Sequence, residues 1–160
     1  MQKMLIAFAL MALAAGAGFG QDKTAAADKT AVMKTVQQFT DAFNKGDGKT
    51  AAAACADQTS IIDEFPPYEW HGAGGCAKWM NDFDADSKKD GITDGSVKLG
   101  PARHVEVTGD RAYVVVPAEY SFKQKGNAIK ESGSTLTVAL KKGANGWRMT
   151  AWTWTKNEVK

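Results

Sequence analysis

Apolar residues recur at helical spacing in the first third of the chain. Four of them follow one another at steps of four, three and four and so share one helical face: Val32, Val36, Phe39 and Phe43. We predict that this helix ends near Lys45, because Gly46 can adopt the conformation that follows a helix cap. Residues 21–30 are rich in Ala, Lys, Asp and Thr and are predicted to form a frayed lead-in to the helix.

Two further helices are predicted before residue 91. Asp47 can cap a short helix from Thr50 to Cys55, where a run of alanines favours helix formation and close packing. A third helix is predicted to begin around Gly74 and to end before Gly91. It presents three residues to the interior: Cys76, Met80 and Phe83.

The remaining pattern predicts strands. Alternating residues indicate one strand from 59 to 65, which must stop before Pro66 and Pro67. From Gly95 onward, turn signals at residues 108–110, 125–127 and 143–146 separate four longer strands, near 96–107, 111–124, 128–141 and 147–156. Because the connections between these strands are short, neighbouring strands are expected to pair antiparallel.

This order of elements predicts an α+β fold. Three N-terminal helices need a partner layer, and the apolar faces of the later strands need a cover. Strands of ten or more residues twist and curl, so we expect a cone-shaped, curved antiparallel sheet that wraps around the three helices. About 140 residues after an N-terminal leader suffice for one domain with its own core.

The first twenty residues resemble a secretory signal peptide. Lys3 supplies a positive charge, and an apolar run of twelve residues, too short to span a bilayer, follows from Met4 to Ala15. Small residues then offer cleavage sites at 15–17 and 20–21. We therefore predict a signal peptide in residues 1–20, a single mature domain in residues 21–160, and export to the periplasm or the extracellular space. The alternative is a retained membrane anchor.

Charge gives no support for nucleic acid or an anionic membrane as partner. Removal of Lys3 lowers the number of basic residues from 20 to 19, against 18 acidic residues, and the lysines are spread along the chain. His71 and His104 lack the spacing of metal ligands, and no glycine-rich phosphate loop follows a strand. We therefore predict no metal, no cofactor, no nucleic-acid partner and, after cleavage of the leader, no membrane attachment.

Cys55 and Cys76 are the two cysteines of the chain and enclose twenty residues. In an exported protein such a pair suggests one disulfide, which would add about 3 kcal/mol of stability by restricting the unfolded chain. Two separately buried thiols remain the alternative, because sequence spacing does not show whether the two Cα atoms come within bonding range.

Asp63 lies on an apolar strand face. Alternation sets its side chain beside those of Ile61 and Phe65 and turns Glu64 toward solvent. Burial makes a carboxylate costly to ionise, so the pKa of Asp63 is expected to rise, and the residue becomes a candidate base or ligand contact. The alternative is a structural carboxylate that is held by local backbone donors before Pro66.

Other side chains accompany Asp63. His71, in the loop that enters the third helix, is a candidate for proton transfer, although a lone loop histidine is commonly a surface residue. Tyr120 is a candidate ligand contact on the apolar face of its strand, where a buried hydroxyl needs a partner; core packing is the alternative. Five aromatic residues either form a ligand-binding rim or pack the wide end of the cone: Tyr68, Trp70, Trp79, Trp152 and Trp154.

With these motifs the chain resembles the nuclear transport factor 2-like superfamily, and within it the SnoaL-like and ketosteroid isomerase-like domains. The resemblance rests on V-x-x-F-x-x-A-F-x-x-G-D at residues 36–47, A-D-Q-T-S-I-I-D at 56–63, W-x-G at 70–72 and G-W-R-M at 146–149. It implies a cystatin-like fold over residues 25–156. It also places Asp63 at the general-base position of ketosteroid isomerase.

The rest of the isomerase site does not carry over. Its oxyanion-donating tyrosine falls at Phe39, and its protonated aspartic acid falls among Thr135, Thr137 and their neighbours. Because one oxyanion donor is worth about 2.7 to 4 kcal/mol of transition-state stabilisation, the resemblance does not imply isomerase activity.

Two functions follow as expectations, and the sequence leaves open whether the protein is an enzyme. The first is the binding of a small, largely apolar molecule in the cone, with acid–base chemistry at Asp63. The second is a non-catalytic interaction domain or homodimer that uses the outer sheet face. The candidate contacts for the second are Tyr113, Val115 and Pro117, together with Trp152 and Trp154.

Overall fold

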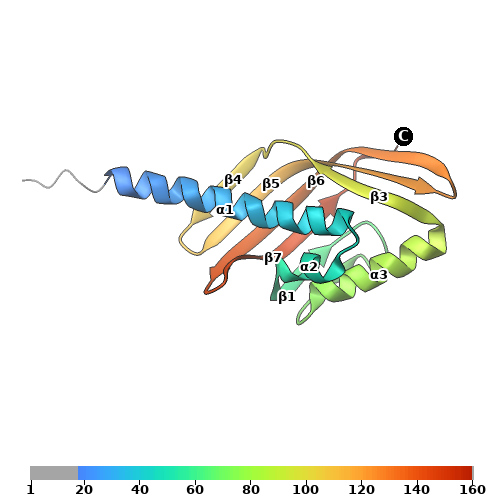
Figure 1. Cartoon of the computed structure of the whole chain (residues 1–160), viewed down its shortest axis with the longest axis horizontal. Helices are drawn as coiled ribbons and strands as arrows, with labels where there is room; N and C mark the ends of the chain where they lie inside the picture. Colours follow the sequence, from blue (N-terminus) through green and yellow to red (C-terminus); the bar gives the residue numbers. More distant parts are fainter. Residues whose placement is uncertain (1–17, 160) are drawn as a thin grey trace, which may run out of the picture.

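The computed structural model describes residues 18–159, in which the chain forms three helices and eight strands. Helix α1 (Gly18–Asn44) runs across one face of a curved sheet, and α2 (Gly48–Ala53) and α3 (Gly75–Asp90) follow it near one end (Figure 1). None of the helices in this range is both long and apolar enough to cross a membrane. Residues 1–17 of the predicted signal peptide lie outside the described residues.

The helices largely follow the sequence signals. The prediction of a frayed lead-in is wrong, because α1 continues through residues 21–30, where alanine and lysine are good helix formers. Asp47 caps α2 as predicted, since its Oδ1 accepts a hydrogen bond from the backbone N–H of Thr50 at 3.0 Å. Gly91 follows α3 with a φ of 68°, a left-handed conformation that favours glycine.

One mixed sheet contains all the strands of the described chain: β1 (Cys55–Ile62), β2 (Glu69–Trp70), β3 (Ile92–Leu99), β4 (His104–Thr108), β5 (Arg111–Gln124), β6 (Asn127–Gly143), β7 (Gly146–Thr155) and β8 (Glu158–Val159). Six strands follow the order β2-β1-β7-β6-β5-β3, while β4 pairs with β5 and β8 pairs with β6. The long strands β5, β6 and β7 correspond to predicted strands and pair antiparallel. The predicted α+β fold of three helices on a curved sheet is therefore confirmed.

Three details of the sheet correct the prediction. β1 pairs with β7 in parallel, because most of the chain rather than a tight turn connects these two strands. The strand predicted near 96–107 is divided into β3 and β4, since Gly100 and Pro101 interrupt it. β1 begins at Cys55, where the second helix was expected to continue, and ends at Ile62, before Asp63.

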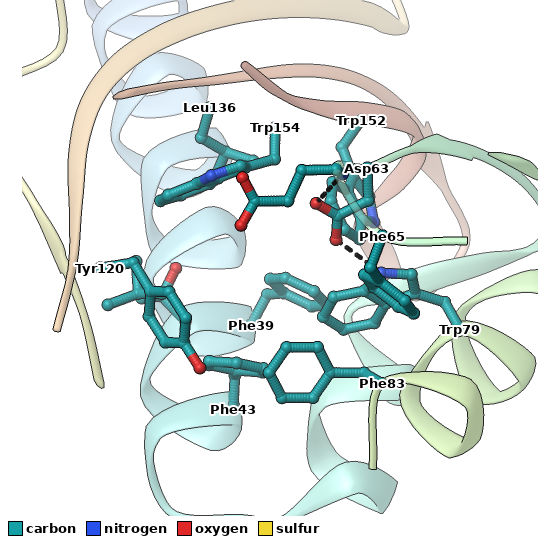
Figure 2. A pocket seen from close by; sticks show the side chains of 13 residues that line it. Phe39, Phe43, Asp63, Phe65, Trp79, Phe83, Tyr120, Leu136, Trp152 and Trp154 are labelled. Atoms are coloured by element: carbon teal, nitrogen blue, oxygen red, sulfur yellow. Dashed lines mark hydrogen bonds between the residues drawn. The ribbon is translucent and has the colours of Figure 1, made fainter. Parts of the chain in front are cut away.

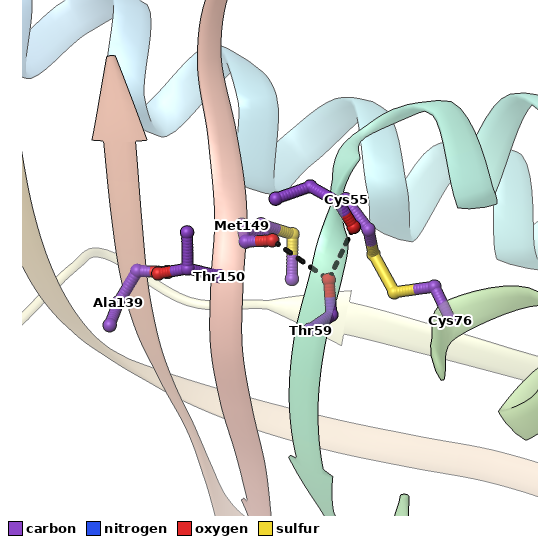
Figure 3. The surroundings of a disulfide bond; sticks show 7 residues. Cys55, Thr59, Cys76, Ala139, Met149 and Thr150 are labelled. Carbon is purple, nitrogen blue, oxygen red and sulfur yellow. Dashed lines mark hydrogen bonds between the residues drawn. A yellow bond between two sulfur atoms is a disulfide. The ribbon is translucent and has the colours of Figure 1, made fainter. Parts of the chain in front are cut away.

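The core fills the space between the helices and the inner face of the sheet. Cys55 on β1 and Cys76 on α3 are joined by a disulfide, with 6.4 Å between their Cα atoms, which confirms the predicted pair (Figure 3). Beside this bond Thr59 is buried, and its hydroxyl donates to the carbonyl of Ala56 at 2.6 Å. This end of β1 is thus held by a covalent bond and by a fully paired buried hydroxyl.

Candidate functional site

A pocket opens between α1, α3, the residues that follow β1, and strands β3, β5, β6 and β7 (Figure 2). Its free volume is about 60 Å³, which is room for a few water molecules. Aromatic rings form most of its wall, and four of its side chains are polar. The lining residues are Phe39, Thr40, Phe43, Asp63, Glu64, Phe65, Trp79, Phe83, Val97, Tyr120, Leu136, Trp152 and Trp154.

Asp63 lies immediately after β1 with its carboxylate on the pocket wall. Its Oδ2 accepts a hydrogen bond from the Trp79 indole N–H at 2.7 Å, and its Oδ1 accepts one from the backbone N–H of Glu64 at 2.7 Å. Burial raises the pKa of Asp63 to about 6, against the lowering effect of these two hydrogen bonds. Asp63 therefore shows features of both interpretations. It lies against apolar side chains, as a candidate base would, and it accepts a local backbone hydrogen bond, as a structural carboxylate would.

Glu64 is exposed, as predicted, but its carboxylate does not lie on the face opposite Asp63. The strand ends at Ile62, so the alternation of side chains does not continue, and the Glu64 carboxylate turns to the pocket with 26% of its side chain exposed. The ammonium of Lys156 lies 2.9 Å from Glu64 Oε2. Partial burial raises the pKa of Glu64 to about 7, and the negative charge of Glu131 adds to this effect, while Lys156 opposes it.

Glu131 on β6 is a third carboxylate that sequence reasoning missed. Its side chain is 0% exposed, its Oε1 accepts hydrogen bonds from the Ser134 hydroxyl and from the Trp154 indole N–H, and its Oε2 lies 3.7 Å from Lys156 Nζ. The sequence feature that could have pointed to Glu131 is Gly133, a glycine within a predicted strand. Its φ is 77°, and the β5–β6 pairing is irregular beside it. A bulge at this position changes which side chains point inward.

Tyr120 on β5 is the cross-strand partner of Glu131 and points into the pocket (Figure 2). Only 7% of the residue is exposed, and its hydroxyl has no hydrogen-bond partner among the described residues. Burial raises the pKa of Tyr120, and the charges of Glu64, Glu131 and Asp63 raise it further. The hydroxyl therefore stays protonated and free to bond.

A sequence model described as a SnoaL-like domain matches residues 32–153, which is most of the chain. The chain belongs to the SnoaL-like family. A search of curated proteins gives no match.

Solved structures share the fold of this SnoaL-like domain. A hexachlorocyclohexane dehydrochlorinase from Novosphingobium barchaimii superposes with a TM-score of 0.74 at 15% identity, over 87% of this chain and 92% of that one. A ketosteroid isomerase-like protein from Erwinia carotovora atroseptica gives 0.65 at 17% identity, over 82% and 97%. An NTF2-like protein with a cystatin-like fold from Novosphingobium aromaticivorans gives 0.71 at 15% identity, over 88% of each chain. At these identities the likeness shows the fold alone.

The SnoaL-like domain brings some of the predicted site residues together and not others. Asp63, Trp79 and Tyr120 line the pocket. Trp70 is buried just behind it, where its indole N–H donates to Asp82 at 2.7 Å and its ring packs against Phe65.

Tyr68 and His71 lie away from the pocket. Tyr68 is largely exposed, and so is the side chain of His71, whose ring nitrogens lie 3.2 Å from Ser60 Oγ and from Glu69 Oε2. The chain leaves β1 at the pocket, and β2 brings it back along β1. The carbonyl of Tyr68 accepts a hydrogen bond from the backbone N–H of Asp63 at 3.1 Å, but neither the Tyr68 nor the His71 side chain lines the pocket. Among the side chains described, those of residues 25–157, no group of three histidine, cysteine or acidic residues is placed to bind a metal ion.

Where ketosteroid isomerase has its oxyanion donors, this chain presents the apolar side chains of Phe39 and Leu136 to the pocket. Phe39 packs against Trp79 and Trp152 with ring centroids 6.0 and 5.6 Å apart. On β6, Leu136 lines the pocket, whereas Thr135 and Thr137 alternate to the other face of the sheet.

The last strand corrects one part of the dimer hypothesis. Trp152 is buried, and both Trp152 and Trp154 line the pocket, so these tryptophans do not belong to the outer face of the sheet.

Proposed function

We propose that the pocket binds a small, largely apolar molecule and that Asp63 makes its principal polar contact by exchanging a proton or a hydrogen bond with it. The observation that carries this proposal is a carboxylate with a pKa of about 6 on the wall of an aromatic pocket. Such a group is present in both protonation states near neutral pH, which suits a general acid or base. The dehydrochlorinase of similar fold bears the name of a small apolar compound, hexachlorocyclohexane.

Export remains part of the proposal. The disulfide is typical of an oxidising compartment, and a single small domain with one such bond fits a periplasmic or extracellular protein.

Benzyl alcohol is a suitable first probe, because it has an aromatic body and one hydroxyl. Binding is measured by the fluorescence of the tryptophans that line the pocket and by NMR of their indole N–H groups. We expect saturable binding that D63N weakens roughly tenfold, the usual worth of a hydrogen bond to a charged group. D57N is the matched control, because Asp57 lies exposed on the same strand. Equal affinity in D63N and the wild type would contradict the role of Asp63.

A second candidate function is the pairing of two copies through the outer face of the sheet. Ile62 and Tyr113 are 58% and 47% exposed, which is unusual for large apolar side chains. Across the strands Ile62 aligns with Thr153, while Tyr113 aligns with Ala139, so small side chains separate the two. Sedimentation tests this candidate: I62E should convert a dimer to a monomer, and a wild type that is already monomeric at high concentration would contradict it.

A further inference from the structure

Carboxylates outnumber cations at the polar end of the pocket. Asp63 and Glu64 line it, and Glu131 lies behind them on β6. In the described part of the chain, Lys156 is the cation that lies within 4 Å of this group, and it serves both Glu64 and Glu131. With all four groups ionised, the site holds three negative charges against one positive charge.

The neighbouring elements do not supply the missing positive charge. The side chains that α1 and α3 contribute to the lining are aromatic or, at Thr40, a hydroxyl that donates to the carbonyl of Val36. The hydrogen-bond donor from α3 is the uncharged indole N–H of Trp79. Tyr120 is the titratable side chain that β5 brings to the pocket.

A second, independent observation points to a ligand at this place. Tyr120 is buried and lines the pocket, and its hydroxyl has no hydrogen-bond partner among the described side chains, residues 25–157 (Figure 2). A buried hydroxyl without a partner is costly and is uncommon in folded proteins. An ammonium group would offer up to three N–H donors, for which the carboxylate oxygens of Asp63 and Glu64 would be the acceptors, and the Tyr120 hydroxyl lines the same pocket.

The pocket wall suits the same kind of group. Eight of the lining residues are aromatic, and the faces of such rings attract cations when water is excluded. Phe39, Trp79 and Phe83 provide apolar surface on the helical side, opposite the strand that carries Tyr120 (Figure 2). The wall therefore accepts both an apolar body and a positive end.

We propose that the pocket selects a ligand whose polar end is a protonated amine, held by Asp63 and Glu64, over neutral or anionic ligands of the same size. This inference rests on the proposed function and names the class of molecule that it takes. The apolar body of the amine lies among the aromatic rings. The ammonium supplies the positive charge that the carboxylates lack.

Proton release follows from this arrangement. Without a ligand, burial holds the pKa of Asp63 at about 6 and that of Glu64 at about 7, so protons partly neutralise the group at neutral pH. An ammonium beside them favours the ionised carboxylates and displaces these protons to solvent. Binding of a cation should therefore tighten as pH rises from 5 to 8, whereas binding of a neutral molecule should not.

Calorimetry with benzylamine and benzyl alcohol tests the inference, because the two probes share a body and differ in the polar end. At pH 8 we expect benzylamine to bind roughly tenfold or more tightly than benzyl alcohol. Between pH 5 and pH 8 only its affinity should rise, with protons released to the buffer. E64Q and D63N should each reduce the preference for the amine, whereas D57N should leave it unchanged.

The outcomes separate this inference from the proposed function. If benzyl alcohol binds and benzylamine binds no more tightly at any pH, the preference for a cation is overturned while the small-molecule pocket stands. If neither probe binds, both proposals are overturned. If E64Q and D63N do not fold, the wild-type pH dependence and proton release decide the matter, since a pocket indifferent to charge would show neither.

Discussion

The two ends of strand β1 differ in how they hold their polar groups. At the Cys55 end, a disulfide joins β1 to α3 and the buried hydroxyl of Thr59 bonds to backbone carbonyls. At the opposite end, Asp63 is partly buried against aromatic rings, and this burial raises its pKa to about 6. The eight residues of β1 thus connect a region whose buried hydroxyl is hydrogen-bonded to a region that contains buried polar atoms without hydrogen bonds.

The buried groups that lack partners gather at the Asp63 end. Among the side chains of residues 25–157, three buried atoms make no hydrogen bond, and they belong to Tyr120, Glu131 and Trp152. Tyr120 and Trp152 line the pocket, and Glu131 lies behind it. An unpaired buried polar group costs about 1 to 3 kcal/mol, so these three groups lower the free energy of unfolding. Such a concentration of unfavourable groups is typical of a functional site.

The largest effect is expected at the satisfied end. Replacing both cysteines, C55A together with C76A, should lower the free energy of unfolding by about 3 kcal/mol, because the unfolded chain regains the freedom of the closed loop. Urea denaturation measures this loss. The titration of Asp63 should stay unchanged; a fall of its pKa in the double variant would show that the two ends of β1 are not independent.

The next effect is a pH dependence at the unsatisfied end. The folded pKa of Asp63 lies above its unfolded value, so the folded protein binds the extra proton and loses stability as pH rises from about 4 to about 6. The gap between 3.8 and about 6 corresponds to about 3 kcal/mol at most. D63N should lose this part of the pH dependence, measured by urea denaturation at each pH.

D57N provides the control for that series, because Asp57 is exposed on the same strand. Its stability should fall with pH between 4 and 6 as in the wild type. Parallel curves for D63N and the wild type would refute the unfavourable burial of Asp63.

A matched pair of hydroxyl deletions contrasts the two ends directly. T59V removes a paired buried hydroxyl and should cost about 1 kcal/mol. Y120F removes an unpaired one and should leave stability unchanged or raise it by up to about 1 kcal/mol. Equal losses in the two variants, by urea denaturation, would mean that Tyr120 has a partner in the folded protein.

The smallest effect concerns the ion pair at the pocket. K156M removes the cation that opposes the rise in the pKa of Glu64, so that pKa should increase further. Stability should change by less than about 1 kcal/mol, because Lys156 is partly exposed. NMR titration of the Glu64 carboxyl measures the shift. An unchanged titration would show that the pair does not form in solution.

Local patterns predicted much of the fold. The helical spacing of Val32, Val36 and Phe39 and the alternation along β5 and β6 identified residues that are buried in the structure. The parallel pairing of β1 with β7 was not predictable in this way, because it joins segments that are distant in the sequence. Short connections inform only about neighbouring strands.

The site was predicted in part, for a related reason. Asp63 and Tyr120 stood out because each is a polar residue on an apolar face. Glu131 was not predicted, because a bulge at Gly133 changes which side chains of β6 point inward. Glu64 was assigned to the wrong face, because β1 ends before it. His71 was favoured by its neighbours in the sequence, yet β2 carries it to the surface.

The carboxyl titration of Asp63 tests the central claim most directly. ¹³C NMR of the wild-type protein, assigned by comparison with D63N, follows this group through the pH range. We predict a midpoint near pH 6, where burial among aromatic rings outweighs the hydrogen bonds from Trp79 and Glu64. A midpoint at or below 4 would contradict the account, since it would make Asp63 an ordinary ionised carboxylate.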